Sequence, residues 1–250
     1  MFGSARHWLA GLGLGDFGAT VLRGVALIMG YLTFNVLFLI WLERKVSGHI
    51  QRRHGPMEVG PHGTLQTVAD MIKLLGKQIL TPVATDRFVY ILAPVLVFVP
   101  TLCLSSLIPL SGAEAFADLP YGLVVLVALS GISVLAIFMA GWASNNKYAV
   151  LGGMRSVSQV IAYEIPILLS ALSVVMIAQS LNLREIVEAQ ARGLPYFLVQ
   201  PVAAMLFFIG ITAETNRAPF DIPEAESELV GGFHTEYSGM RFAMFFFAEY

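Results

Sequence analysis

The stretch from Glu214 to Glu228 holds the densest group of chemically capable side chains in this 250-residue chain. It reads ETNRAPFDIPEAESE and sets five carboxylates against one base, Arg217. The carboxylates belong to Glu214, Asp221, Glu224, Glu226 and Glu228. Asp221 can cap a short helix with Glu224 three residues on, and Glu224 and Glu228 then share a face. Carboxylates held close together cannot all ionise cheaply, so some should have raised proton affinity. The stretch therefore predicts either a proton path or a solvated acidic loop.

The composition around this stretch indicates a membrane environment. Hydrophobic residues make up 56% of the chain and charged residues only 13%, with a mean hydropathy of +0.72. Soluble domains carry roughly 25% charged residues, so this chain could not cover a water-facing surface. The net charge of −2 gives no field that would attract nucleic acid.

Long apolar runs define the predicted architecture, because a membrane-spanning helix needs about 20 apolar residues. The predicted helices cover about 21–42, 88–110, 119–143, 157–181 and 194–213, with a partial sixth at 240–250. The runs are continuous, which disfavours the alternating strands of a membrane barrel. The fold class is therefore an all-α polytopic membrane protein, with 1–250 as a single membrane domain.

The Lys and Arg residues predict the orientation of the chain. With the N-terminus outside, eleven of the 15 fall in inner segments and four in outer ones. The long loops 43–87, 144–156 and 214–239 are then cytoplasmic.

Glu164 lies inside the fourth apolar run, where an ionisable group costs several kcal/mol unless it is paired, hydrated or protonated. Such residues usually mark an ion or substrate route, although a structural or snorkelling glutamate is the alternative. Glu214 ends the fifth run on the same side of the membrane. The two side chains could therefore extend the acidic stretch into one chain of buried carboxylates.

The 43–87 segment contains an amphipathic pattern over about 64–80. Apolar residues recur at helical spacing from Leu65 to Ile79, while Asp70, Lys73 and Lys77 fall on the other side. The pattern fits a helix in the interface plane. It is interpreted either as a surface anchor or as the wall of a ligand chamber. The basic loop before it, 43–63, is either a stiff functional loop or a site for lipid headgroups.

The single cysteine limits the redox chemistry of the chain. Cys103 lies in an apolar run, and one thiol cannot hold an iron–sulfur cluster or a Cys-based zinc site. No metal site is expected, so a redox centre would belong to a partner or to a diffusing ligand.

Three long stretches carry a resemblance to a known family. They read LERKVSGHIQRRHGPMEVGPHGTLQTVADMIKLLGKQ, GWASNNKYAVLGGMRSVSQVIAYEIP and AETNRAPFDIPEAESELVGGFHTEYSGMRFAMFFFAEY, and together cover about 100 residues. In these stretches the chain resembles the H subunit of proton-translocating NADH-quinone oxidoreductase, respiratory complex I. The predicted spans between them fall where that family has helices.

The resemblance implies a subunit without a redox cofactor that anchors the peripheral arm and shapes a quinone-access chamber. The quinone is the substrate, FMN and iron–sulfur clusters belong to partner subunits, and antiporter-like membrane subunits are further partners. By motif, the chamber residues are Arg44, Arg53, Asp70, Arg217 and Phe220. The implied proton path to the antiporter-like subunits consists of Glu164, Glu214, Asp221, Glu224 and Glu228. The resemblance also implies that the chain crosses a bacterial inner membrane several times.

Two departures and two alternatives accompany this interpretation. Gln78 stands where the family usually has Glu, and the family has eight spans, so the chain is expected to be truncated at its C-terminus. A related membrane-bound hydrogenase or other oxidoreductase uses a similar anchor subunit. A stand-alone ion transporter would instead place its sites at mid-membrane on broken helices, whereas the polar residues here gather at the inner surface.

Overall fold

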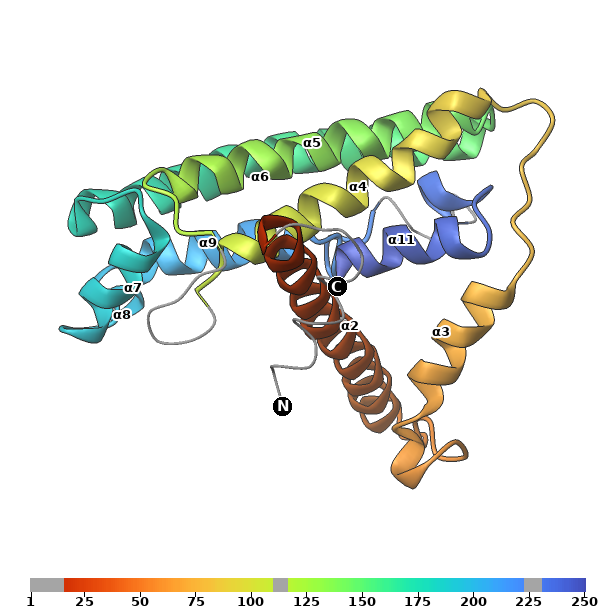
Figure 1. The fold of residues 1–250 in the computed structure, drawn as a ribbon, viewed down its shortest axis with the longest axis horizontal. Helices are drawn as coiled ribbons and strands as arrows, with labels where there is room; N and C mark the ends of the chain where they lie inside the picture. Colours follow the sequence, from red (N-terminus) through yellow and green to blue (C-terminus); the bar gives the residue numbers. More distant parts are fainter. Residues whose placement is uncertain (1–15, 110–116, 223–230) are drawn as a thin grey trace.

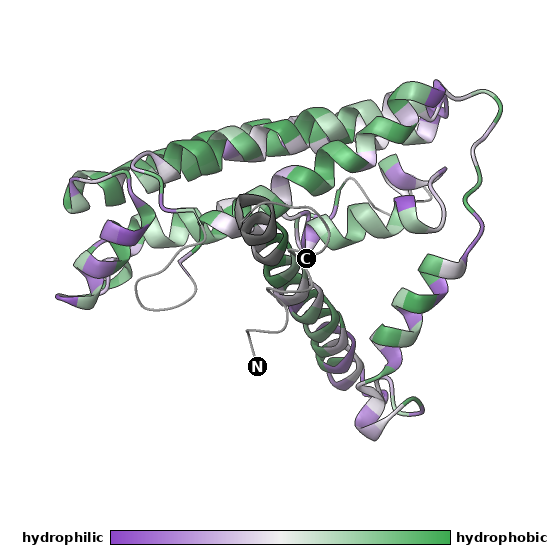
Figure 2. Ribbon diagram, in the orientation of Figure 1, coloured by the Kyte–Doolittle hydropathy of each residue, from purple (hydrophilic) through white to green (hydrophobic). Residues whose placement is uncertain are grey.

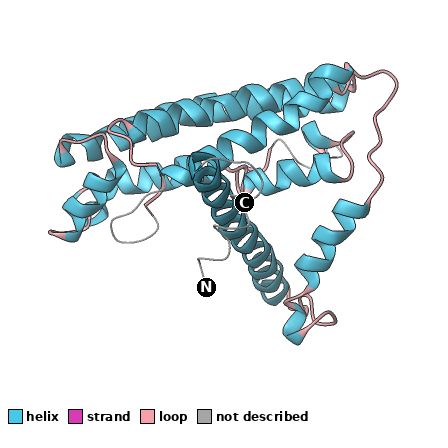
Figure 3. Ribbon diagram, viewed as in Figure 1, coloured by secondary structure: helices cyan, strands magenta, loops and turns pink. Residues whose placement is uncertain are grey.

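The computed structural model describes residues 16–109, 117–222 and 231–250, and these are helical with no strand (Figures 1 and 3). The all-α fold class is therefore confirmed. The helices are α2 (Asp16–Ile50), α3 (Gln66–Gly76), α4 (Arg87–Leu107), α5 (Gly122–Ala143), α6 (Lys147–Ala178), α7 (Leu183–Ala191), α8 (Tyr196–Val199), α9 (Pro201–Glu214) and α11 (Met240–Glu249). Two 3-10 turns, η1 (Pro61–Gly63) and η2 (Gly232–His234), lie in the loops.

Four helices of the described chain are long and apolar enough to cross a membrane. They comprise Gly24–Ile50, Arg87–Leu107, Gly122–Ala143 and Lys147–Ala178. The predicted span 194–213 is instead divided at Gln200 between the single turn α8 and the 14-residue α9. Pro201 starts α9 and has no N–H for the preceding turn. At about 21 Å, α9 alone is shorter than the hydrocarbon core of about 30 Å.

Helix α6 is longer than the sequence predicts. It begins at Lys147 rather than near 157, and the side chain of Asn146 caps it by accepting a hydrogen bond of 2.9 Å from the Tyr148 N–H. Residues 147–156, for which the sequence predicts a loop, are therefore helical. Glu164 consequently lies deep in the helix, about 26 Å along its axis from Lys147.

The helices form a layered bundle in which α4, α5 and α6 lie side by side (Figure 1). Helix α9 packs on α6 and α11 packs on α4, so α9 and α11 form a second layer and run toward each other. Small buried residues such as Ala93, Ala136 and Ala140 let the helices approach closely, and Tyr90 and Phe245 fill the space beside them. This arrangement brings the C-terminal ends of α9 and α11 together.

Helices α2 and α3 meet away from the bundle and are joined by the loop 51–65 (Figure 1). Within it, Gly63 has φ of +76° and approaches Pro56 so closely that a Cβ would lie 2.1 Å from the Pro56 carbonyl oxygen. The expected amphipathic helix is present as α3, although it covers Gln66–Gly76 rather than the whole of 64–80. Figure 2 shows polar and apolar residues alternating along it.

His234 in η2 is enclosed by aromatic rings and is 9% exposed. The rings of Phe233, Phe242 and Phe246 lie 5.0, 5.2 and 5.8 Å from its own, between centroids. Burial lowers the pKa of His234 from 6.5 to about 4, so the imidazole is neutral in the folded protein at neutral pH. The folded protein thus binds fewer protons than the unfolded chain between these pH values.

We expect acid to destabilise the fold through His234. The free energy of unfolding has its full value above pH 6.5 and falls as the pH drops toward about 4, because the unfolded chain then binds a proton that the buried His234 does not. The maximum loss is about 3 kcal/mol. The measurement is the thermal unfolding midpoint of the solubilised complex as a function of pH. His234→Phe, which cannot be protonated, should flatten this dependence. An equal fall in the midpoint of wild type and variant would contradict the prediction.

Candidate functional site

Arg217, in the turn after α9, contacts α2 and α11, which are far from each other in the sequence. Its Nη1 lies 3.0 Å from Glu43 Oε2 in α2, and its Nη2 lies 3.3 Å from Glu249 Oε1 in α11. The guanidinium also lies 4.0 Å from the centre of the Tyr250 ring. The Tyr250 hydroxyl donates a hydrogen bond of 2.6 Å to Glu43 Oε2 and accepts one of 3.2 Å from Arg217 Nη1. We call these four residues the Arg217 cluster.

The charges of the Arg217 cluster do not balance when both carboxylates are ionised. Burial acts to lower the pKa of Arg217, but the hydrogen bond with Tyr250 and the charges of Glu249 and Glu43 raise it overall. The guanidinium therefore stays positive, and any proton exchange within the cluster falls to the carboxyl groups. Two carboxylates beside one cation are a suitable place to hold or release a proton.

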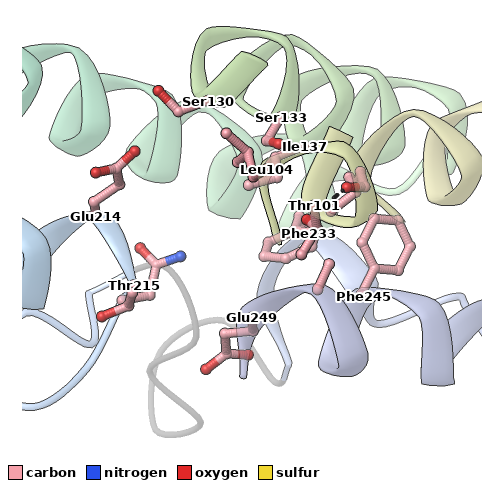
Figure 4. A pocket seen from close by; sticks show the side chains of 13 residues that line it. Thr101, Leu104, Ser130, Ser133, Ile137, Glu214, Thr215, Phe233, Phe245 and Glu249 are labelled. Atoms are coloured by element: carbon pink, nitrogen blue, oxygen red, sulfur yellow. Dashed lines mark hydrogen bonds between the residues drawn. The ribbon is translucent and has the colours of Figure 1, made fainter. Parts of the chain in front are cut away.

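A cavity of about 240 Å³ lies beside the Arg217 cluster, between α4, α5, α9 and α11. Figure 4 shows Glu214 and Glu249, from the C-terminal ends of α9 and α11, on one side and the hydroxyls of Ser130 and Ser133 of α5 on the other. Helix C-termini disfavour anions, so these carboxylates need a cation, water or a proton for compensation. We call this space the Glu214 cavity, and it has the polar lining that buried water requires.

Glu164 lines a different cavity, of about 310 Å³, between α5 and α6. Its neighbour there is Gly131, whereas the adjacent Ser130 lines the Glu214 cavity. The charges of Glu164 and Glu214 nevertheless interact. The structure thus places the two predicted carboxylates in adjoining cavities rather than in one common cavity.

Arg44 and Asp70 form an ion pair that lines a third cavity, of about 220 Å³. This space lies between α2, α3 and α11, and Phe242, Phe246 and Phe247 provide much of its wall. We call it the α2–α3 cavity. A mostly apolar cavity with one oriented polar pair can hold a flat apolar ligand that carries a polar head.

Three further predicted site residues, Arg53, Phe220 and Asp221, line neither the Glu214 cavity nor the α2–α3 cavity. Arg53 follows α2 and donates a hydrogen bond of 2.6 Å to Gln51 Oε1. Phe220 packs edge-on against Tyr163, with 5.1 Å between ring centroids, and lines an open cavity of about 670 Å³. Asp221 is exposed, and its charge interacts with that of Glu249. Glu224 and Glu228 lie outside the described residues.

The sequence interpretation missed three members of the Arg217 cluster, namely Glu43, Glu249 and Tyr250. Each ionisable group borders an apolar run, which is a signal that could have identified it. Their convergence depends on the packing of α2 and α11, which local sequence patterns do not encode. Within the described ranges, no three His, Cys, Asp or Glu side chains gather as metal ligands.

These features define a polytopic helical membrane protein with ionisable groups gathered in and beside cavities of its bundle. Residues 23–250 match a family described as NADH dehydrogenase. The H subunit of NADH-quinone oxidoreductase from Dehalococcoides mccartyi (strain CBDB1) is 45% identical over 237 residues, covering 95% of this chain and 67% of the relative. The H subunit from Geobacillus sp. (strain WCH70) is 50% identical over 228 residues, covering 91% and 68%. That of Bacillus thuringiensis subsp. konkukian (strain 97-27) is 49% identical over 235 residues, covering 94% and 69%.

The chain belongs to the family of H subunits of NADH-quinone oxidoreductase. The recognition made from its three sequence stretches is therefore confirmed. It spans about two thirds of the length of these relatives.

Proposed function

We propose that this chain is the membrane subunit of an NADH-quinone oxidoreductase that forms part of the quinone-access chamber and couples quinone reduction to proton translocation. The α2–α3 cavity is the chain's contribution to the chamber, and the Glu214 cavity is part of the proton route. Family membership supports the activity, and the two cavities support the division of labour within the chain.

One observation carries the proposal: the Arg217 cluster lies between the two cavities. Glu43 belongs to the cluster and the next residue, Arg44, lines the α2–α3 cavity. At the other end, Glu249 belongs to the cluster and lines the Glu214 cavity. A change of charge in the first cavity can therefore act on carboxyl groups of the second through one guanidinium.

Quinone reduction supplies such a change of charge, because electrons arrive on the quinone and its oxygens then take up protons. Arg44 and Asp70 would orient the polar head of the quinone. Arg217 stays positive throughout, so a negative charge near Arg44 competes with Glu249 for the field of this guanidinium and alters how strongly Glu249 holds a proton. Glu214 and Glu164 would pass that change toward neighbouring membrane subunits.

The electron donors, FMN and iron–sulfur clusters, would reside in partner subunits of the peripheral arm, which the basic loop 43–63 would help to anchor. Antiporter-like membrane subunits would receive the proton signal. The chain would sit in a bacterial inner membrane with its N-terminus outside.

Arg217→Gln tests the proposal directly. We expect the quinone reductase rate of the assembled complex to fall about tenfold, because the variant leaves Glu43 and Glu249 without their cation. The effect is discounted for solvent screening, because the Arg217 side chain is 31% exposed. The quinone reductase rate of Arg217→Lys should lie between those of the wild type and Arg217→Gln, since an ammonium group keeps the charge but loses the planar fork of the guanidinium.

The assay follows NADH oxidation with added quinone in membrane vesicles that contain the whole complex. Arg184→Gln is the matched control, because Arg184 of α7 pairs with Glu188 and Asp118 at one end of the bundle, away from the Arg217 cluster (Figure 1). A normal rate in Arg217→Gln would refute the proposed function. Co-purification of hydrogenase subunits in place of an NADH-oxidising arm would favour the alternative donor.

A further inference from the structure

Gln159 is a buried polar residue of α6 that has no role in the proposed function. The residue is 8% exposed and lies against the turn that follows α9. Its Nε2 lies 2.8 Å from the Ala213 carbonyl oxygen and 2.9 Å from that of Phe220. It also lies 3.3 Å from Asn216 Oδ1. A single side-chain amide thus holds both ends and the middle of the 213–220 turn.

The chemistry of the partners fixes the orientation of this amide. Backbone carbonyl oxygens can only accept hydrogen bonds, so the Gln159 nitrogen must face Ala213 and Phe220. Gln159 Oε1 has no hydrogen-bond partner among the described residues. Gln159 therefore anchors the turn to α6 through its side-chain N–H donors alone.

The turn that Gln159 holds carries Glu214 and Arg217. Its centre is Asn216, a buried residue with φ of +49°, a conformation that asparagine tolerates better than most residues. The backbone N–H groups of Thr215, Asn216, Arg217 and Phe220 make hydrogen bonds of 2.9, 3.3, 3.1 and 2.7 Å that shape the turn itself. None of these bonds reaches α6. The amide of Gln159 therefore adds the side-chain hydrogen bonds that seat this turn, which carries Glu214 and Arg217, on α6.

Gln159 also stands between two cavities. Asn216, which it contacts, lines the Glu214 cavity. Gln159 itself and Phe220 line the open cavity on the other side of the turn. If the amide released the turn, the open cavity would gain access to Glu214.

We propose that Gln159 is a positioning residue that fixes the 213–220 turn on α6 and keeps the Glu214 cavity closed to the open cavity beside Phe220. The inference rests on the proposed function of Glu214 and Arg217. With the amide in place, protons reach Glu214 only along the coupled route. Without it, Glu214 exchanges protons through the open cavity, and quinone reduction proceeds with fewer protons translocated.

The test compares variants of the whole complex in sealed membrane vesicles, with NADH oxidation and proton translocation measured together. Gln159→Met keeps the approximate shape and removes the donors. We expect NADH oxidation to stay within about twofold of wild type, while protons translocated per NADH fall about fivefold, as for a lost buried hydrogen bond. Gln190→Met is the matched control, because Gln190 makes its amide contacts with Ile186 of α7 and Tyr196 of α8, at one end of the bundle and away from the 213–220 turn (Figure 1).

Gln159→Glu gives a second readout that a purely structural role would not change. The protonated carboxyl group can donate one hydrogen bond to the turn, whereas the carboxylate can donate none and repels the carbonyl oxygens. The ratio of protons to NADH should therefore be higher in acidic buffer than in alkaline buffer for this variant, and nearly constant for wild type. This comparison decides the matter if Gln159→Met fails to assemble.

A normal proton ratio in Gln159→Met, or a ratio in Gln159→Glu that does not depend on pH, would overturn the inference. Its failure is distinguishable from failure of the proposed function. If Glu214→Gln stops translocation while Gln159→Met does not, only the role of Gln159 is wrong. If neither variant changes translocation, the proposed function itself is wrong.

Discussion

Glu214→Gln is expected to reduce NADH-driven proton translocation by about a hundredfold or more, while the complex still assembles. Gln has almost the same shape as Glu but cannot bind and release a proton. Loss of a positioned proton-transfer group typically costs a factor of about 10²–10⁴. Glu214 ends α9, lines the Glu214 cavity and interacts with the charge of Glu164.

The measurement pairs acidification of sealed vesicles with a native gel that reports assembly. Glu188→Gln is the control, because Glu188 pairs with Arg184 and Arg192 at one end of the bundle, away from Glu214 (Figure 1). Glu214→Asp should recover part of the activity, since it keeps the carboxyl group and shifts its position. Full coupled activity in Glu214→Gln would remove Glu214 from the proton route.

The sequence predicted those parts of the site that depend on local pattern. The amphipathic pattern predicted the helix that is present as α3, although the face that carries Asp70 lines the α2–α3 cavity together with Thr67 and Met71 and meets Arg44 there. The apolar runs likewise predicted α4 and α5 to within a few residues. In each case the signal is the periodicity of burial within one element.

The parts that were missed depend on contacts between distant elements. Glu43 and Glu249 look like ordinary ends of apolar runs until α2 and α11 bring both to Arg217. The early start of α6 was hidden for a related reason. Gly152 and Gly153 weaken an isolated helix by about 1 kcal/mol each, and only close packing against other segments explains their presence inside one.

Gly152 is the site of the second large expected effect, because α6 lies very close to the backbone of η2 there. A Cβ at this position would lie 2.7 Å from Gly232 Cα and 2.9 Å from Phe233 N, and both are backbone atoms. Alanine is favoured over glycine inside a helix by about 1 kcal/mol. Here the overlap must displace the backbone of η2, and such overpacking costs about 1–3 kcal/mol or more. The steric term therefore outweighs the gain in helix propensity.

We expect Gly152→Ala to lower the amount of assembled complex and its thermal inactivation temperature, and Gly152→Val to abolish assembly. The reason extends beyond local strain. Phe233, next to the contact, packs in the hydrophobic core and lines the Glu214 cavity. A displaced η2 would therefore open the core and the proton route together. The matched control is Gly30→Ala in α2, where a Cβ meets nothing within 4 Å. Normal assembly of Gly152→Val would show that α6 and η2 do not pack this closely, and the Glu214 cavity would then lack the wall on which its role depends.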